Sequence, residues 1–201
     1  MDPLFATRAV HAGRHDFQRL GVHAPPIDFS STYPTPHLDS AARSFDSLAS
    51  GDGPQGSFIY QRLFNPTTDR AERAVAELEG AEDAAAFASG MAAFTAVLLA
   101  AKSRGSHVVA VRPLYGTSDH LLTSGLLGLR VTWATQDTVA DAITPETALV
   151  VIETPANPTL EIVDLAAVCR LAHKAGAKVI VDNVFATPIL QRPLELGADI
   201  V

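Results

Sequence analysis

The stretch that decides the fold lies at residues 148–183 and reads ALVVIETPANPTLEIVDLAAVCRLAHKAGAKVIVDN. It begins with an apolar run, Ala148–Ile152, and ends with a second one, Lys178–Val181. Between them, the residues of Asp164–Ala175 repeat with the spacing of an amphipathic helix, which Gly176 ends. Two short Val-rich runs joined by one helix are typical of a βαβ unit, in which parallel strands are covered on both faces.

The same alternation extends toward the N-terminus. A helix is expected to start at Asn65, which can cap it with Pro66 in the first turn, and to stop at Gly80. Three further apolar runs are expected to be strands: Ala84–Ala88, His107–Val111 and Arg130–Ala134. We therefore predict an α/β fold with a mainly parallel sheet and helices on both faces.

Residues 1–64 show no clear periodicity and are punctuated by prolines and by the cluster Gly51–Pro54. This composition indicates an extended arm with turns. Such an arm packs on another surface, for which a neighbouring subunit is a good candidate. We expect an N-terminal arm at residues 1–64, followed by one domain at residues 65–201.

Composition restricts the possible partners and compartment. The chain has 201 residues, 47% of them hydrophobic and 18% charged, which is typical of a globular protein. Its net charge of −7 argues against nucleic acid as the main partner, because phosphate binding needs clustered Lys and Arg. The single cysteine, Cys169, excludes an internal disulfide and a cysteine-rich zinc site. A reducing, cytoplasmic compartment fits, and the seven histidines form no convincing metal set.

One uncharged segment, Ala84–Ala101, is just long enough to span a bilayer. Half of it is alanine and it holds Ser89 and Gly90, so a buried strand, a turn and a buried helix are the better interpretation. No signal peptide is visible, because no apolar run follows the basic residues near the N-terminus. We expect no membrane partner.

Polar and glycine-containing turns follow the predicted strands. In a parallel sheet, ligands bind outside the carboxyl ends of the strands. Four segments meet that edge: Ser89-Gly90-Met91, Pro113–Gly116, Glu153–Pro158 and Asp182-Asn183. Their convergence predicts a small-molecule site.

Two of these turns have a chemical interpretation and a structural alternative. Ser89-Gly90-Met91 opens a helix, whose free N–H groups suit an anion, although it can also be a plain tight turn. Asp182 ends an apolar strand and is suited to hold a proton on a heterocyclic nitrogen, although it can also cap a helix or turn.

Four further side chains are candidates on weaker grounds. Tyr115 can stack on a flat ring or move a proton, or it can be a half-buried aromatic. Asn157, between two prolines, is held in one orientation or is an ordinary Asn-Pro turn. Tyr60 and Arg62 face the same side if that piece is extended, and the two groups suit a phosphate. Their alternative is a solvated arginine near a packed tyrosine.

Taken in order, these segments resemble the Cys/Met-metabolism pyridoxal-phosphate enzymes, which include cystathionine γ-synthase, cystathionine γ-lyase, methionine γ-lyase and O-acylhomoserine sulfhydrylase. No single string is decisive, but the ordered set is specific and runs over nearly the whole length. The matching strings are Tyr60-Gln-Arg, Asn65-Pro-Thr, Leu78-Glu-Gly80, Ser89-Gly-Met91, Tyr115-Gly116, Glu153–Thr159, Val181-Asp-Asn183, Phe185–Pro188 and Leu196–Val201.

The resemblance implies an aspartate-aminotransferase-like large domain that binds pyridoxal 5'-phosphate. It implies that Ser89, Gly90 and Met91 hold the cofactor phosphate. It implies that Asp182 pairs with the pyridinium nitrogen and that Asn157 bonds the phenolic oxygen.

The same resemblance gives roles to the remaining three residues. Tyr115 is expected to stack on the cofactor ring and to serve as an acid or base. Tyr60 and Arg62 are expected to reach the phosphate in a neighbouring subunit's site. The implied assembly is a homo-oligomer, a dimer or a tetramer with intersubunit sites, acting on a small amino acid.

The chain departs from the family pattern in three ways. Val184 stands where the family usually has threonine, and Thr117 does not support the methionine γ-lyase pattern, which has cysteine there. The Schiff-base lysine of the family follows the last residues of this chain, and the lysines present, Lys102, Lys174 and Lys178, lie in other contexts. The domain at residues 65–201 is therefore expected to be incomplete at its C-terminal end, with weak or noncovalent cofactor binding and little turnover by these 201 residues alone.

Three functions compete on the sequence. The leading one is a transsulfuration-type enzyme that performs γ-elimination or γ-replacement on cystathionine, homocysteine or O-acylhomoserine-type amino acids. The second is a non-catalytic or split-gene binding protein of the same fold. The third is an aminotransferase, against which the Tyr60/Arg62 and Glu153–Thr159 strings argue. The sequence does not choose between lyase, synthase and sulfhydrylase.

Overall fold

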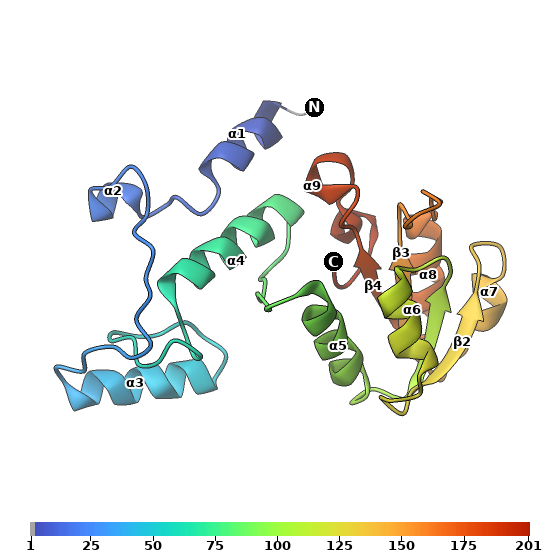
Figure 1. The fold of residues 1–201 in the computed structure, drawn as a ribbon, viewed down its shortest axis with the longest axis horizontal. Helices are drawn as coiled ribbons and strands as arrows, with labels where there is room; N and C mark the ends of the chain where they lie inside the picture. Colours follow the sequence, from blue (N-terminus) through green and yellow to red (C-terminus); the bar gives the residue numbers. More distant parts are fainter. Residues whose placement is uncertain (1–2) are drawn as a thin grey trace. The chain divides into compact units, whose positions relative to one another are not determined.

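The computed structural model describes residues 3–201, which form two compact units. One unit comprises residues 79–81 and 87–201 and contains the sheet; the other comprises residues 3–78 and 82–86 and is helical (Figure 1). No helix in the described part of the chain has the length and apolarity that a membrane span requires.

The sheet has four parallel strands in the order β2-β1-β3-β4. Their bounds are β1 His107–Val111, β2 Arg130–Ala134, β3 Thr147–Glu153 and β4 Lys178–Asp182. Four predicted strands are thus confirmed, and β3 is one residue longer at each end than predicted. The helices of this unit are α5 Gly90–Ala101, α6 Gly116–Thr123, α7 Val139–Ala142, α8 Leu165–Lys174 and α9 Thr187–Leu190, with a 3-10 turn at Pro193–Leu196.

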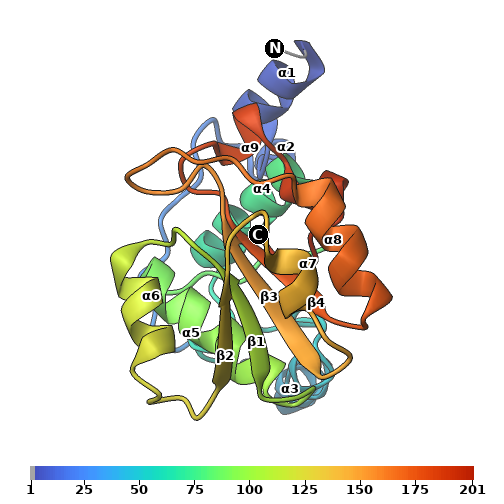
Figure 2. The ribbon, with the colours of Figure 1, turned by 90° about the vertical axis from the view of Figure 1, so that its right-hand side faces the viewer.

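Both faces of the sheet are covered, as predicted. Because side chains alternate along a strand, neighbouring residues of β1 enter different cores. Val109 packs in a cluster with α7 and α8, whereas Val108 packs in a cluster with α5 and α6. Figure 2 shows α8 on one side of the strands and α5 and α6 on the other. Burial on both faces explains why the strands read as unbroken Val-rich runs.

The predicted strand at Ala84–Ala88 is wrong. These residues are half-buried or exposed, and in the described sheet they pair with no strand. Alanine buries little apolar surface and has a weak preference for strands. The N–H of Ala86 instead donates to the Glu72 carboxylate at 2.7 Å. Ser89 therefore follows a loop and not a strand.

The predicted helix starts are confirmed by their caps. The Asn65 side chain accepts from the N–H groups of Thr67 and Thr68, at 2.9 and 3.1 Å, at the start of α4, Pro66–Glu79. Asp164 accepts from Ala167 at 2.9 Å at the start of α8. Each side chain satisfies N–H groups that have no partner within the helix.

Three helices in the first 64 residues were not predicted. They are α1 Pro3–His11, α2 Phe17–Leu20 and α3 Leu38–Ala49. In α3, Leu38, Ala41, Phe45 and Leu48 do have the spacing of an amphipathic helix, but Leu38 and Phe45 are exposed, and the buried residues are Ala41, Ser44 and Ser47. Residues 22–37 contain no helix, and Thr32 forms an isolated antiparallel bridge with Tyr60. The division into an arm at residues 1–64 and a domain at residues 65–201 stays a prediction.

A buried histidine joins three strands at the amino end of the sheet. His107 is 2% exposed, and its two ring nitrogens lie 2.8 Å from the Thr132 hydroxyl and 3.0 Å from the Thr147 hydroxyl. Burial lowers the pKa of His107, and the nearby Arg130 acts in the same direction. The folded protein therefore favours the neutral ring.

We predict that the stability of the protein falls as the medium becomes acidic, in part through His107. The unfolded chain binds the proton near pH 6.5, above the folded-state pKa, so the contribution is complete above pH 6.5 and is lost as pH decreases. His107→Gln should lower stability by about 1–3 kcal/mol at pH 7.5, because it disturbs buried hydrogen bonds.

Urea unfolding of both proteins at pH 7.5 and pH 5.5 tests this. The loss of stability on acidification should be smaller in the variant than in the wild type. Equal losses would show that His107 does not contribute to the acid sensitivity.

Candidate active site

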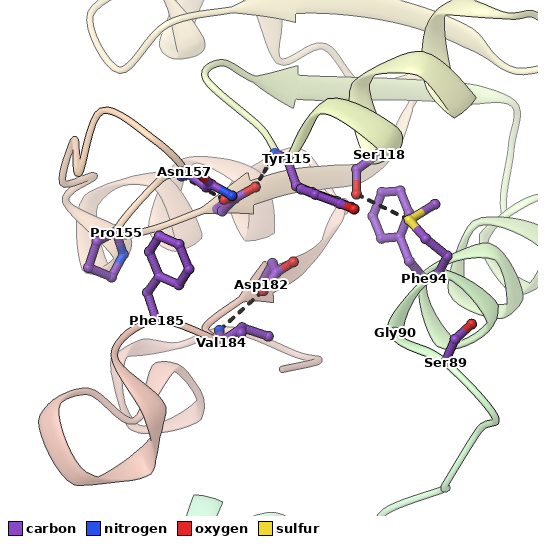
Figure 3. Close-up of a pocket in the computed structure, with 12 residues that line it drawn as sticks. Ser89, Gly90, Phe94, Tyr115, Ser118, Pro155, Asn157, Asp182, Val184 and Phe185 are labelled. Carbon is purple, nitrogen blue, oxygen red and sulfur yellow. Dashed lines mark hydrogen bonds between the residues drawn. The ribbon is translucent and has the colours of Figure 1, made fainter.

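The polar turns predicted at the carboxyl edge of the sheet do come together. They line a cavity of about 460 Å³, within the range of about 300–1,000 Å³ of small-molecule sites. Six of the eight predicted site residues line it: Ser89, Gly90, Met91, Tyr115, Asn157 and Asp182. Figure 3 shows Ser89 and Gly90 on one side, Asn157 and Phe185 on the other, and Tyr115 and Asp182 between them.

The start of helix α5 presents free backbone donors to the cavity. The Ser89 hydroxyl accepts from Ala92 N–H at 3.1 Å, and the first bond of the helix runs from Ala93 N–H to the Ser89 carbonyl at 3.1 Å. The N–H groups of Gly90 and Met91 precede that bond. A Cβ built on Gly90 would meet no atom within 4 Å, so a ligand can approach the backbone. The helix dipole favours an anion there.

Tyr115 lies at the start of helix α6, and its side chain is 44% exposed on the cavity. The Arg112 guanidinium fixes the loop between β1 and α6, which carries Tyr115. It donates to both oxygens of Asp119, at 2.6 and 3.0 Å, and lies 3.7 Å above the Trp133 ring. The hydrogen bond from Arg112 holds the pKa of Asp119 below its usual value. Arg112 thus ties the end of β1 to the first turn of α6.

Glu153, the last residue of β3, was not among the predicted site residues. Glu153 is 7% exposed, and its carboxylate accepts from Tyr115 N–H and, at 2.8 Å, from Asn157 N–H. Burial raises its pKa, the two N–H bonds oppose that rise, and the nearby Asp182 adds to it. The signal in the sequence was a carboxylate ending an otherwise apolar strand.

Asp182 ends β4 beside Glu153, with which it is paired in the sheet register. One of its oxygens accepts from Val184 N–H at 3.1 Å. The following loop is tied to the loop after β3, because the Gln191 side chain donates to the Thr154 carbonyl at 2.9 Å and to the Asn183 amide at 2.8 Å. These bonds hold the loop that carries Asn157 and the loop that follows Asp182 together.

Tyr60 and Arg62, the other two predicted residues, belong to the helical unit. They contact each other, with the Arg62 guanidinium 4.7 Å from the centre of the Tyr60 ring. The predicted extended geometry is wrong, because Leu63 N–H bonds the Tyr60 carbonyl at 2.9 Å and makes a turn. The turn places an exposed arginine against an aromatic face, which is a favourable cation–π contact.

The described residues contain no group of three or more His, Cys, Asp and Glu side chains placed to hold a metal ion. Two histidines pair with carboxylates instead: His15 with Glu77 at 3.2 Å, and His173 with Asp199 at 2.9 Å.

Comparison with known proteins gives a consistent result. A family model described as "Cys/Met metabolism PLP-dependent enzyme" matches residues 6–201. An L-methionine gamma-lyase of Streptomyces avermitilis is 56% identical over 198 residues, which are 97% of this chain and 47% of that protein. One of Pseudomonas putida is 39% identical over 204 residues, 99% of this chain and 50% of that protein. The chain therefore spans about half the length of the curated relatives it matches.

Solved structures agree with these matches. A cystathionine gamma-lyase from Lactobacillus plantarum complexed with L-serine has a TM-score of 0.83 at 33% identity. The match covers 98% of this chain and 49% of that one. A cystathione gamma lyase (CalE6) from Micromonospora echinospora has a TM-score of 0.77 at 40% identity, with coverage of 97% and 49%. Both matches confirm the predicted aspartate-aminotransferase-like fold. The departure at Thr117 did not separate the chain from proteins named methionine gamma-lyase.

Proposed function

This chain belongs to the family of Cys/Met metabolism PLP-dependent enzymes, and from that membership we propose that it forms the cofactor-binding half of a lyase that eliminates the γ-substituent of a sulfur-containing amino acid. The observation that carries the proposal is the cavity at the carboxyl edge of the sheet, with free N–H donors on one side and Asp182 beside β3. Methionine is the first candidate substrate, because relatives at 56% and 39% identity are named L-methionine gamma-lyase.

The groups lining the cavity fit pyridoxal phosphate, the cofactor of this family. A phosphate suits the start of α5, where Gly90 leaves open space and the Ser89 side chain is already used as a cap. A protonated ring nitrogen suits the Asp182 carboxylate, and the phenolic oxygen suits the Asn157 amide. The half-exposed ring of Tyr115 offers an aromatic face.

When bound, pyridoxal phosphate supplies an electron sink that acidifies the α and β carbons of an amino acid, so that a γ-substituent can leave. The residues of this chain bind and orient. Asp182 would keep the proton on the ring nitrogen. Asn157 and the start of α5 would fix the position of the cofactor in the cavity. Tyr115, whose phenol faces the cavity (Figure 3), moves a proton as an acid or base.

We further propose that Tyr60 and Arg62 complete the phosphate site of a neighbouring subunit. Arg62 is exposed, and its guanidinium is already oriented by the Tyr60 ring. Guanidinium and phenol are suitable donors for a phosphate. The protein would then act as a homo-oligomer of at least two copies, because no copy has a complete site alone.

Cystathionine is the second candidate substrate, because two solved structures with the same fold are named as enzymes that act on it. A binding protein without turnover is the alternative from another functional class. The reaction products separate these possibilities.

We expect the full natural gene product, purified with pyridoxal phosphate, to convert methionine and water into methanethiol, ammonia and 2-oxobutanoate in equal amounts. Thiol and 2-oxo acid are measured together, with cystathionine and O-acetylhomoserine plus thiol as comparison substrates. A faster reaction with cystathionine than with methionine would identify cystathionine as the substrate. Consumption of O-acetylhomoserine alone would indicate a synthase. Cofactor binding without any turnover would identify a binding protein.

Asp182→Asn should weaken the binding of pyridoxal phosphate to this chain about tenfold or more, because it removes a hydrogen bond between charged groups, worth about 1.5–3 kcal/mol. The dissociation constant is measured by quenching of Trp133 fluorescence. Asp141→Asn, an exposed carboxylate on α7, is the matched control and should bind normally. Equal affinities of the two variants would remove Asp182 from the site.

Mixing of variants tests the intersubunit role of Arg62. Co-expressed Arg62→Ala and Asp182→Asn chains should form hybrid dimers in which one of the two sites has neither change. With random pairing, half of the dimers are hybrids, so about a quarter of all sites should bind cofactor with wild-type affinity. Dimers of either variant alone should have no site with wild-type affinity. Bound cofactor per subunit is the measurement. No recovery in the hybrids would place Arg62 and Asp182 in the same subunit's site.

A further inference from the structure

Glu153 combines burial with charge in a way that the proposed cofactor contacts leave unexplained. It ends a strand whose seven residues are all buried, and its own side chain is 7% exposed. A buried carboxylate is costly unless it is fully hydrogen-bonded. Its position is therefore informative about what it holds.

Both carboxylate oxygens of Glu153 are used, and both accept from the main chain. One accepts from the N–H of Tyr115, which begins α6, and the other from the N–H of Asn157 at 2.8 Å. Tyr115 and Asn157 belong to different loops, after β1 and after β3. Their side chains line the same cavity. A single carboxylate thus connects the two loops, and Glu153 itself also lines the cavity.

We propose that Glu153 is the positioning residue of this site: its carboxylate sets where the Tyr115 ring and the Asn157 amide lie relative to a bound cofactor. Other side chains also hold these loops, but each of them holds only one of the two. Arg112 holds the first turn of α6 through Asp119, and Gln191 holds the carbonyl of Thr154. Glu153 joins the two loops directly.

The role requires a carboxylate and not merely a polar side chain. An ionised carboxylate has two acceptor oxygens, which match two N–H donors. A glutamine of the same size has one acceptor oxygen and one NH2 group, which would face an N–H donor. Glu153→Gln therefore keeps the volume but loses one of the two bonds.

The inference rests on the proposed function for the identity of the ligand, and the test separates the two. Glu153→Gln is compared with Glu161→Gln, an exposed carboxylate in the same loop. Three quantities are measured: amide hydrogen exchange at residues 115 and 157 without ligand, the dissociation constant for pyridoxal phosphate, and the visible circular dichroism of the bound cofactor. Circular dichroism reports the asymmetry of the surroundings of the ring, which a purely structural role would not change.

In Glu153→Gln we expect exchange at residue 115 or 157 to become at least about tenfold faster and cofactor affinity to fall about tenfold, as for one lost hydrogen bond to a charged group. We also expect an altered circular dichroism band. Glu161→Gln should match the wild type in all three. Protection of the amides of β1–β4 checks that the variant is folded.

The inference is overturned if Glu153→Gln exchanges as the wild type does, or if exchange rises while affinity and circular dichroism stay unchanged. If Glu153→Gln loses protection in the strands, Glu153→Asp, which keeps the charge but is shorter by one methylene, is measured in the same way. Retention of wild-type affinity and dichroism by that variant would also overturn it. A wild-type protein that binds no pyridoxal phosphate contradicts the proposed function, while the exchange rates still decide whether Glu153 fixes the two loops.

Discussion

The arrangement of the site depends on a sheet that is parallel and buried on both faces. Parallel strands need crossover helices, and these cover the two faces of β1–β4 through alternate side chains such as Val108 and Val109. Every strand therefore ends at the same edge. Loops that are far apart in the sequence meet there, and the cavity lies between them.

Several polar residues at this edge, among them Glu153, Thr154 and Asn183, are buried and need hydrogen-bond partners. Side chains serve this purpose: Glu153 accepts from the backbone of two loops, and Gln191 donates to Thr154 and Asn183. The same bonds that satisfy buried groups hold Tyr115, Asn157 and Asp182 around one cavity. The bonds that satisfy these buried groups therefore also fix the walls of the cavity.

The helical unit has a different physical character from the sheet unit. It buries small residues of α3 and has a partly buried ion pair between Arg70 and Asp16. Several of its large apolar side chains, among them Ile27, Phe29 and Leu38, are exposed. Exposed apolar side chains together with the stacked Tyr60 and Arg62 are consistent with the proposed role at a neighbouring subunit.

The sequence by itself determined the strands β1–β4, the helices capped by Asn65, Ser89 and Asp164, and the family, because hydrophobic periodicity, caps and ordered motifs are local properties. It failed for Ala84–Ala88, where an alanine run imitates a buried strand, and for α3, although Leu38, Ala41, Phe45 and Leu48 there have helical spacing. Only the tertiary structure revealed that Glu153 joins the loops of Tyr115 and Asn157. That link forms between residues 38 positions apart and depends on how β1 and β3 pair, which no local pattern encodes.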